Sequence, residues 1–293
     1  MATSATVVPF RRVAILGLGL MGASLGMALR AGGLARSVAG YDAAQGMAQR
    51  ACERGAVDQA CATAAEAVTG ASLVVLAAPV LTLRGLLAEV APYLAPRAIV
   101  TDLGSTKAEV THWAEEALPN AARFVGGHPM AGSECSGVEA ADAGLYRGCV
   151  WCLTPTERTS ARALQRTQSL IAALGAQPLM IAPAQHDAAV ALISHLPLLS
   201  AVALMLTAAG MPNWPAARRL AAGGFRDGTR VASGDPRMGH DICLTNTQPL
   251  LTALDAYLAT LHDLRERLAS ADTTLEATLY EAKTLRDAWL ARG

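Results

Sequence analysis

Three glycines at the end of a short apolar run restrict the fold of this chain more than any other feature of its sequence. Gly17, Gly19 and Gly22 form the pattern G-x-G-x-x-G within RVAILGLGLMG. The apolar run before Gly17 predicts a buried strand, and residues 20–32 predict a helix. A strand, a glycine-rich turn and a helix in this order are typical of the first unit of a dinucleotide-binding domain.

Each residue of this motif has a physical role in holding a dinucleotide. Gly17 permits the tight turn, Gly19 lets the backbone approach the pyrophosphate, and Gly22 lets the helix pack closely on the strand. Leu20 and Met21 open the helix, whose N-terminus supplies partial positive charge. The alternative interpretation is three glycines that serve only a turn.

An acidic residue favours one dinucleotide over another. Asp42 lies twenty residues after Gly22, at the end of the next expected strand, SVAGYD. Its carboxylate can accept hydrogen bonds from the adenosine ribose hydroxyls and would repel a 2′-phosphate. The sequence therefore predicts NAD as the cofactor rather than NADP.

The composition excludes several classes of protein. The chain has 293 residues, of which 52% are hydrophobic and 16% charged, far from the profile of a disordered chain. Lys+Arg and Asp+Glu number 24 each, so no excess charge calls for a nucleic-acid partner. Among the 6 cysteines, Cys149 and Cys152 form a C-x-x-C in an apolar run expected to be a strand, whereas a zinc site would need a second ligand pair. We expect buried, reduced cysteines, no metal site and a cytoplasmic protein.

Hydrophobic patterning divides the chain near residue 182. Residues 1–182 alternate short apolar runs with helical patterns, which predicts a Rossmann-type doubly wound α/β domain with a parallel sheet. Residues 183–293 are rich in Ala and Leu and predict an all-α domain. The further expected strands are SVAGYD, SLVVLAAP, AIVTDLGS, ARFVGGHP, GCVWCLTP and QPLMIA, and further expected helices cover residues 43–55, 157–174, 185–209, 214–222, 235–270 and 274–291.

One apolar stretch requires comparison with a membrane helix. Residues 188–210 carry no formal charge over 23 positions, which is long enough to span a bilayer. Ser194, His195 and Pro197 interrupt its middle, and no aromatic belt flanks it. The N-terminus, MATSATVVPFRR, lacks the apolar core of a signal peptide. We expect a helix buried between domains or subunits and no membrane partner.

Two later loops carry side chains suited to chemistry. DLGSTK and GGHPMAGSE both follow expected strands, so both lie at the carboxyl ends of the sheet, where ligands of doubly wound folds bind. His128 stands between Gly127 and Pro129, on a tight loop that suits a reactive side chain. The helical half contributes ISHLP and GGFRDGTRVASGDP.

In this order, GLGLMG, DLGSTK, GGHPMAG, HD…SHLP and GFRDGTR resemble the prephenate/arogenate dehydrogenase family of tyrosine biosynthesis. The resemblance spans roughly residues 12–270, and several of these motifs are specific to that family. It implies a nucleotide-binding domain followed by a helical dimerisation domain, and hence a homodimer. It also implies a reaction in which hydride leaves C4 of a cyclohexadienol for NAD, carbon dioxide leaves C1 and the ring becomes a phenol.

The resemblance gives roles to three side chains. His128 matches the family's catalytic histidine, a hydrogen-bond acceptor for the C4 hydroxyl, which suits neutral imidazole. Ser105 matches the serine beside that hydroxyl and the nicotinamide; by itself it would be a helix N-cap before residues 106–110. Arg230 matches the arginine that grips a substrate carboxylate with its planar fork; by itself it would be a surface or salt-bridged arginine.

Other residues match positions that line the family's substrate pocket. Asp227 is expected to pair with Arg230. His195 is expected on a helix facing the cleft, although such a histidine is as readily a satisfied core residue. Besides Arg230, the implied substrate-binding residues are Ser133, Glu134, Ser194, His195 and Asp227.

The sequence departs from the family's pattern at two places that concern the substrate. Many prephenate-using members read S-H-L-P-H, where this chain has Leu198. Some also carry a tryptophan in P-x-M-W-R-D, which is PRMGHD in this chain. Members of the cyanobacterial arogenate type look closest, but those often use NADP, against which Asp42 argues. These departures favour arogenate and leave prephenate or dual use open.

Two other functions compete with this interpretation. The β-hydroxyacid dehydrogenases share the two-domain outline but use a lysine early in the second domain, and residues 183–282 contain none. A non-catalytic NAD sensor explains the first half but not His128, Ser105 and Arg230 together. We also expect a monofunctional enzyme, without a regulatory or chorismate mutase segment beside these motifs.

Overall fold

The computed structural model describes residues 8–131 and 136–291, which form parts of two compact units. The first unit covers residues 1–247 and the second covers residues 248–293. Each unit is described by itself. The division into domains 1–182 and 183–293 stays a prediction.

The first unit is built on one sheet with the strand order β3-β2-β1-β4-β5-β6-β7-β8. The chain runs outward from β1 to β3 and then returns to place β4 on the other side of β1. The topological switch point therefore lies between β1 and β4. The short strand β3 was not predicted. The strands are β1 Val13–Leu16, β2 Val38–Tyr41, β3 Gln59–Ala60, β4 Leu73–Leu76, β5 Ile99–Asp102, β6 Phe124–Pro129, β7 Val150–Thr154 and β8 Gln177–Met180.

The predicted parallel pairing is correct from β3 to β6 and wrong at β7, which pairs antiparallel with β6. A parallel pair needs a crossover, and the described part of the β6–β7 connection contains only a short 3-10 turn, Val138–Ala140. The helix α6, Ala161–Ala173, supplies a crossover between β7 and β8, which pair parallel with each other.

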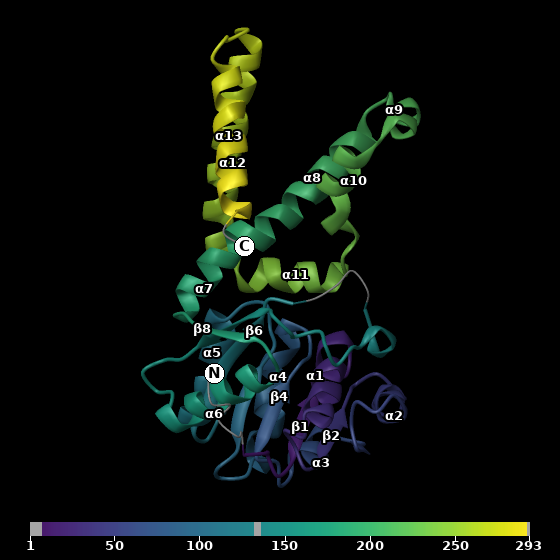
Figure 1. Cartoon of the computed structure of the whole chain (residues 1–293), viewed down its shortest axis with the longest axis vertical. Coiled ribbons are helices and arrows are strands. Elements are labelled where there is room, and N and C mark those ends of the chain that lie inside the picture. Colours follow the sequence, from purple (N-terminus) through teal and green to yellow (C-terminus); the bar gives the residue numbers. More distant parts are fainter. Residues whose placement is uncertain (1–7, 132–135, 292–293) are drawn as a thin grey trace. The chain divides into compact units, whose positions relative to one another are not determined.

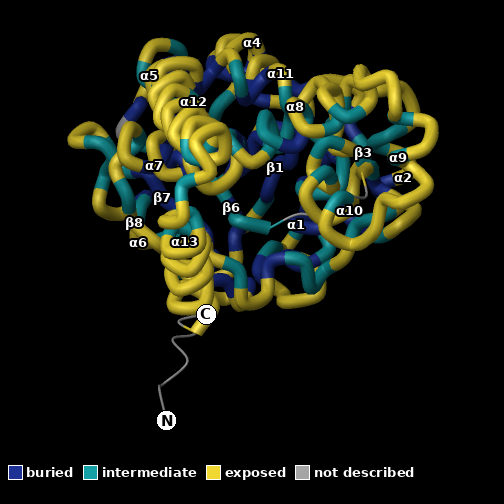
Figure 2. The backbone as a smooth tube through the Cα atoms, turned by 90° about the horizontal axis from the view of Figure 1, so that it is seen from above, coloured by how far each residue is buried: buried dark blue, intermediate teal, exposed yellow. Residues whose placement is uncertain are grey.

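Helices cover both faces of this sheet (Figure 1). In β1, Val13 and Ile15 belong to one apolar cluster and Ala14 and Leu16 to the other, because successive side chains of a strand point to opposite faces. Burial on both faces explains the continuous apolar runs of the sequence, and Figure 2 shows the buried residues concentrated in these strands. The first face packs against α1 Leu20–Ala31, α2 Met47–Glu53 and α6, and the second against α3 Ala64–Val68, α4 Val80–Val90 and α5 Ala108–Ala117.

One helix of the first half begins later than predicted. Residues 43–55 were expected to be helical, but α2 starts at Met47. The Asp42 carboxylate accepts a hydrogen bond from the Ala44 amide at 2.8 Å, and Gly46 has a φ of 77°. Both features favour a turn over a helix at this point.

Helices alone follow β8 in the first unit. The predicted helix over residues 185–209 is present, with a π-helical turn at Ala191–His195 before Pro197. The predicted helix over residues 235–270 is interrupted at Asn246. The helices are α7 Pro183–Val190, α8 Leu196–Gly210, α9 Trp214–Leu220, α10 Gly223–Thr229 and α11 Pro236–Thr245, and α9 and α10 lie along the part of α8 far from the sheet (Figure 1).

The described residues of the second unit form two helices joined by a short turn. The unit contains almost all of α12, Thr247–Ala269, and the whole of α13, Leu275–Leu290. Ala271, between them, has a φ of 50°, which ends the first helix in a tight turn.

One helical segment among the described residues, Pro183–Gly210, is long and apolar enough to cross a membrane. The mean hydropathy of an 18-residue stretch within this segment reaches 2.1, and 22% of that stretch is buried within the chain. Length and composition are weak evidence for a membrane span, because the core or interface helix of a soluble protein meets the same test.

Candidate active site

The glycine-rich loop follows β1 at the switch point, and two of its glycines are enforced by crowding. Gly17 has a φ of 100°, and a Cβ there would lie 2.5 Å from the Ala77 carbonyl oxygen at the end of β4. A Cβ at Gly22 would lie 1.9 Å from the Gly17 carbonyl oxygen. Nothing lies within 4 Å of a Cβ built at Gly19. The backbone before α1 is therefore open where a pyrophosphate would approach, which fits a dinucleotide.

Asp42 joins this loop to the end of β2. One carboxylate oxygen accepts a hydrogen bond from the Leu18 amide at 2.7 Å, and the other accepts one from Ala44. The half-exposed side chain thus fixes the loop while keeping lone pairs for a ribose. It also lines a surface pocket formed by residues 41–46, 48–49 and 60–62.

A buried ion pair holds the backbone next to His128. The Gly127 amide donates to the Asp102 carboxylate at 3.0 Å, and the Lys107 ammonium donates to the Gly127 carbonyl at 2.9 Å. Lys107 and Asp102 also pair with each other, and both side chains are fully buried. One ion pair therefore fixes both peptide groups of Gly127 and sets the end of β6.

The His128 ring continues into a chain of hydrogen bonds. Its Nδ1 lies 2.8 Å from Nε2 of His186, whose Nδ1 lies 2.7 Å from the Asp187 carboxylate. That carboxylate accepts hydrogen bonds from the backbone amides of Lys107 and Ala108, each at 2.8 Å, at the start of α5. Three elements, β6, α5 and α7, thus meet at two histidines and one aspartate.

Burial and neighbouring charges keep His128 neutral. Burial lowers its pKa well below the usual 6.5, and the His186, Lys107 and His195 side chains lower it further. A neutral imidazole near pH 7 can accept a hydrogen bond, so the local electrostatics suit a base.

His195 is a second buried histidine in this region. The Asn246 amide donates to its Nδ1 at 3.0 Å and to the Asp187 backbone carbonyl at 2.8 Å. Burial lowers the pKa of His195 to about 4. With Nδ1 accepting, the neutral ring carries its proton on Nε2. His195 is therefore a buried histidine with a hydrogen-bond partner at Nδ1, and its contact with substrate stays a prediction.

The helix α11 lies across the edge at which the strands end (Figure 1). Its Asp241 carboxylate accepts a hydrogen bond from the Leu81 amide of α4 at 3.1 Å. Its Thr245 hydroxyl lies 2.8 Å from that of Thr106. These contacts tie the helical half of the unit to the loops that carry the predicted site.

Ser105 lies half-buried in the loop between β5 and α5, but it does not cap the helix. The N-cap residue of α5 is Lys107, and its side chain accepts no hydrogen bond from the backbone amides of the first turn. Asp187 instead accepts from the Lys107 and Ala108 amides. The interpretation of Ser105 as an N-cap is therefore wrong, because a carboxylate from another helix occupies that role.

The other predicted substrate residues lie on the helical segments. Arg230 begins the 3-10 turn Arg230–Ser233 and Asp227 lies one turn earlier in α10; both are exposed, on a segment that packs against α8. Ser194 is exposed in the π-helical turn. Their contacts with substrate stay predictions. Ser133 and Glu134 lie outside the described residues.

Several residues of this network were not predicted as part of the site. The sequence carried a signal for some of them: His186 and Asp187 are adjacent at the start of an apolar helix, and Lys107 is one of only two lysines in the chain. Asp102 ends a predicted strand. Asn246 had no signal, because only the fold brings it to His195.

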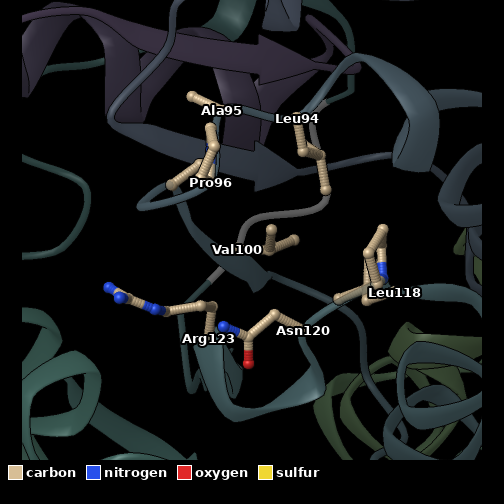
Figure 3. Close-up of a pocket in the computed structure, with 9 residues that line it drawn as sticks. Leu94, Ala95, Pro96, Val100, Leu118, Asn120 and Arg123 are labelled. Carbon is tan, nitrogen blue, oxygen red and sulfur yellow. The ribbon is translucent and has the colours of Figure 1, made fainter.

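A separate pocket lies at the other edge of the sheet (Figure 3). It forms where β5 and β6 begin, whereas His128 lies where β6 ends. Its position excludes it from the site just described. Its lining residues are Leu94, Ala95, Pro96, Ala98, Val100, Leu118, Pro119, Asn120 and Arg123.

Two family models match consecutive parts of the chain. The nucleotide-binding domain of prephenate dehydrogenase matches residues 25–180, and the dimerization domain of prephenate dehydrogenase matches residues 182–281. The chain belongs to the prephenate dehydrogenase family. This membership confirms the resemblance seen in the sequence and the predicted fold class, and it favours a prephenate dehydrogenase-type enzyme over the β-hydroxyacid dehydrogenase and the NAD sensor.

Relatives in other organisms agree with this assignment. The chain is 34% identical to the prephenate dehydrogenase of Bacillus subtilis over 94% of this chain and 75% of that protein. It is 35% identical to the cyclohexadienyl dehydrogenase of Zymomonas mobilis over 90% of each.

Solved structures of the family share the fold. A Synechocystis arogenate dehydrogenase has a TM-score of 0.82 at 33% identity, covering 95% of this chain and 99% of that chain. An Aquifex aeolicus prephenate dehydrogenase in complex with hydroxyphenyl propionate and NAD+ has a TM-score of 0.90 at 32% identity, covering 96% and 99%.

The buried ion pair predicts a large loss of stability when its cation is removed. Lys107→Met leaves the Asp102 carboxylate buried without a positive partner, which we expect to cost about 3–5 kcal/mol in the free energy of unfolding. Asp102→Asn combined with Lys107→Met should recover part of this loss, because an amide needs no cation. Denaturant unfolding measures the free energy of unfolding of the wild type, of Lys107→Met and of the double variant.

Lys283 offers a matched control for this family member. It is exposed and pairs with Asp287 one turn away, so Lys283→Met should change stability by less than about 1 kcal/mol. A Lys107→Met protein as stable as Lys283→Met would show that the ion pair does not hold the loop.

Proposed function

We propose that this chain catalyses the NAD-dependent oxidative decarboxylation of arogenate or prephenate, with His128 as the hydrogen-bond acceptor for the substrate C4 hydroxyl. The observation that carries the proposal is a histidine with a lowered pKa at the carboxyl end of β6, the same edge of the sheet as the glycine-rich loop, in a chain whose relatives include prephenate, arogenate and cyclohexadienyl dehydrogenases.

The residues of the chain divide the work of this reaction. His128 accepts the proton of the C4 hydroxyl as the C4–O bond gains carbonyl character. Bound NAD supplies the hydride acceptor for C4. The bond between C1 and the carboxylate breaks, carbon dioxide leaves, and the electron pair of that bond completes the aromatic ring as a phenolate. His128 returns the proton to the phenolate oxygen. Ser105 orients the same hydroxyl, and Arg230 binds a substrate carboxylate.

NAD rather than NADP is the cofactor that we propose. Asp42 already accepts from Leu18 and Ala44, so its negative charge is held in place at the end of β2. A 2′-phosphate at this position would meet that charge. The support is the fixed carboxylate together with the open backbone at Gly19.

Arogenate is the substrate that we propose as preferred. The two departures from the pattern of many prephenate-using members lie against each other: a Cβ built at Gly239 would be 3.4 Å from Leu198 Cδ2. Leu198 replaces a histidine and Gly239 replaces a tryptophan, so one place in the fold has lost two polar groups. An apolar residue in place of that histidine resembles the arogenate type.

The helical half supports a homodimer in the cytoplasm. Large apolar side chains of the π-helical turn and α8 are exposed in the single chain, among them Leu192, Ile193 and Leu206. Association through such a face would remove them from water. The described cysteines are free thiols, which is consistent with a reducing compartment.

The dimer predicts a concentration-dependent mass. One chain has a mass of 30.2 kDa, and sedimentation of the purified chain at micromolar concentration should give twice that mass. A single-chain mass under these conditions would refute the dimer.

The activity itself is tested by formation of NADH with purified protein. Arogenate and prephenate are supplied in parallel, each with NAD and with NADP. We expect turnover with NAD and a higher kcat/KM for arogenate than for prephenate. His128→Asn should lower kcat by roughly 10²–10⁴-fold, the usual contribution of a general base, while NAD binding persists.

The surface histidine His112 provides the control. His112→Gln removes an exposed imidazole from α5 and should leave kcat unchanged. Tight NAD binding with no turnover of either substrate would contradict the proposed activity. A His128→Asn protein with full kcat would contradict the role of His128 alone.

A further inference from the structure

The hydrogen bonds behind His128 have a direction, and Asp187 sets it. Its carboxylate accepts from the Lys107 and Ala108 amides at the start of α5, where the helix favours negative charge. Its side chain is 2% exposed, so water does not compete for it. An ionised carboxylate has no hydrogen to donate. The hydrogen bond at 2.7 Å to His186 must therefore carry its proton on the His186 Nδ1.

The position of that proton fixes the next one. With Nδ1 protonated, a neutral His186 has its lone pair on Nε2, which lies 2.8 Å from Nδ1 of His128. Two lone pairs cannot share a hydrogen bond, so His128 carries its proton on Nδ1. Its own Nε2 is then without a hydrogen and free to accept one.

We propose that His186 and Asp187 are positioning residues that hold His128 in the tautomer with the proton on Nδ1 and the lone pair on Nε2. The inference rests on the proposed role of His128 as the acceptor. It assigns a positioning role to two residues of α7, neither of which touches the reacting atoms.

The same arrangement receives the charge that the reaction creates. When Nε2 of His128 accepts the hydroxyl proton, the ring becomes an imidazolium with protons on both nitrogens. Passing the Nδ1 proton to His186 Nε2 would leave His128 neutral again and put the positive charge beside the Asp187 carboxylate. In either position the charge is stabilised by a carboxylate held in place before the reaction.

Two substitutions of similar volume separate this role from a packing role. In His186→Gln, the amide oxygen can take the place of Nε2 and accept from His128 Nδ1. His186→Leu fills the space and offers no acceptor. We expect kcat to fall roughly 10²-fold in His186→Leu and to stay within roughly tenfold of the wild type in His186→Gln, with the KM for NAD unchanged in both.

The tautomer is directly visible in ¹⁵N NMR spectra of histidine-labelled protein, at a pH well above 6.5. The wild-type spectrum should show His128 protonated on Nδ1, and the His128→Asn spectrum assigns the signal. His186→Leu should populate the Nε2-protonated form.

The outcomes distinguish this inference from the proposed function. If His128→Asn keeps full kcat, the proposed base is wrong and the inference falls with it. If His128→Asn loses activity while His186→Leu and His186→Gln both match the wild type, only the positioning role is overturned. A wild-type His128 protonated on Nε2 would overturn it as well.

Discussion

The rest of the site depends on the hydrogen bonds that the Asp187 carboxylate makes with α5 and with His186. This carboxylate accepts hydrogen bonds from the first amides of α5 and contacts His186. A residue of α7 thus caps α5, a helix that packs on the sheet. A helix N-terminus needs such an acceptor, and here the need is met from the helical half of the unit. The same carboxylate that caps the helix also contacts the histidine behind His128, the proposed acceptor.

A second constraint acts on the backbone rather than on the ring. Asp102 and Lys107 bind the two peptide groups of Gly127 from the end of β5 and the start of α5. Because both side chains are fully buried, either one left alone would carry an uncompensated charge. The loop position and the ring orientation of His128 are thus set by separate devices that meet at Lys107, whose ammonium serves the first and whose amide serves the second.

The parts of the molecule that the sequence predicted are those encoded by local patterns. The glycine motif, the apolar strands and Asp42 depend on neighbours in the chain, and the structure has them where the patterns indicated. The reversal of β7 was missed because the direction of a strand depends on the length and form of its connection, which the apolar pattern does not encode. The acceptor at the start of α5 was assigned to Ser105 because the true acceptor, Asp187, is eighty residues away.

The most direct test of a neutral acceptor at His128 is the pH dependence of kcat at saturating substrate and NAD. His128 is active when neutral, and burial with His186, Lys107 and His195 around it lowers its pKa below 6.5, while Asp187 acts on it only through His186. Activity should therefore hold as the pH falls to 6.5 and decline only below that value. A decline that begins above pH 6.5 would show a histidine that is easily protonated, and would contradict the account.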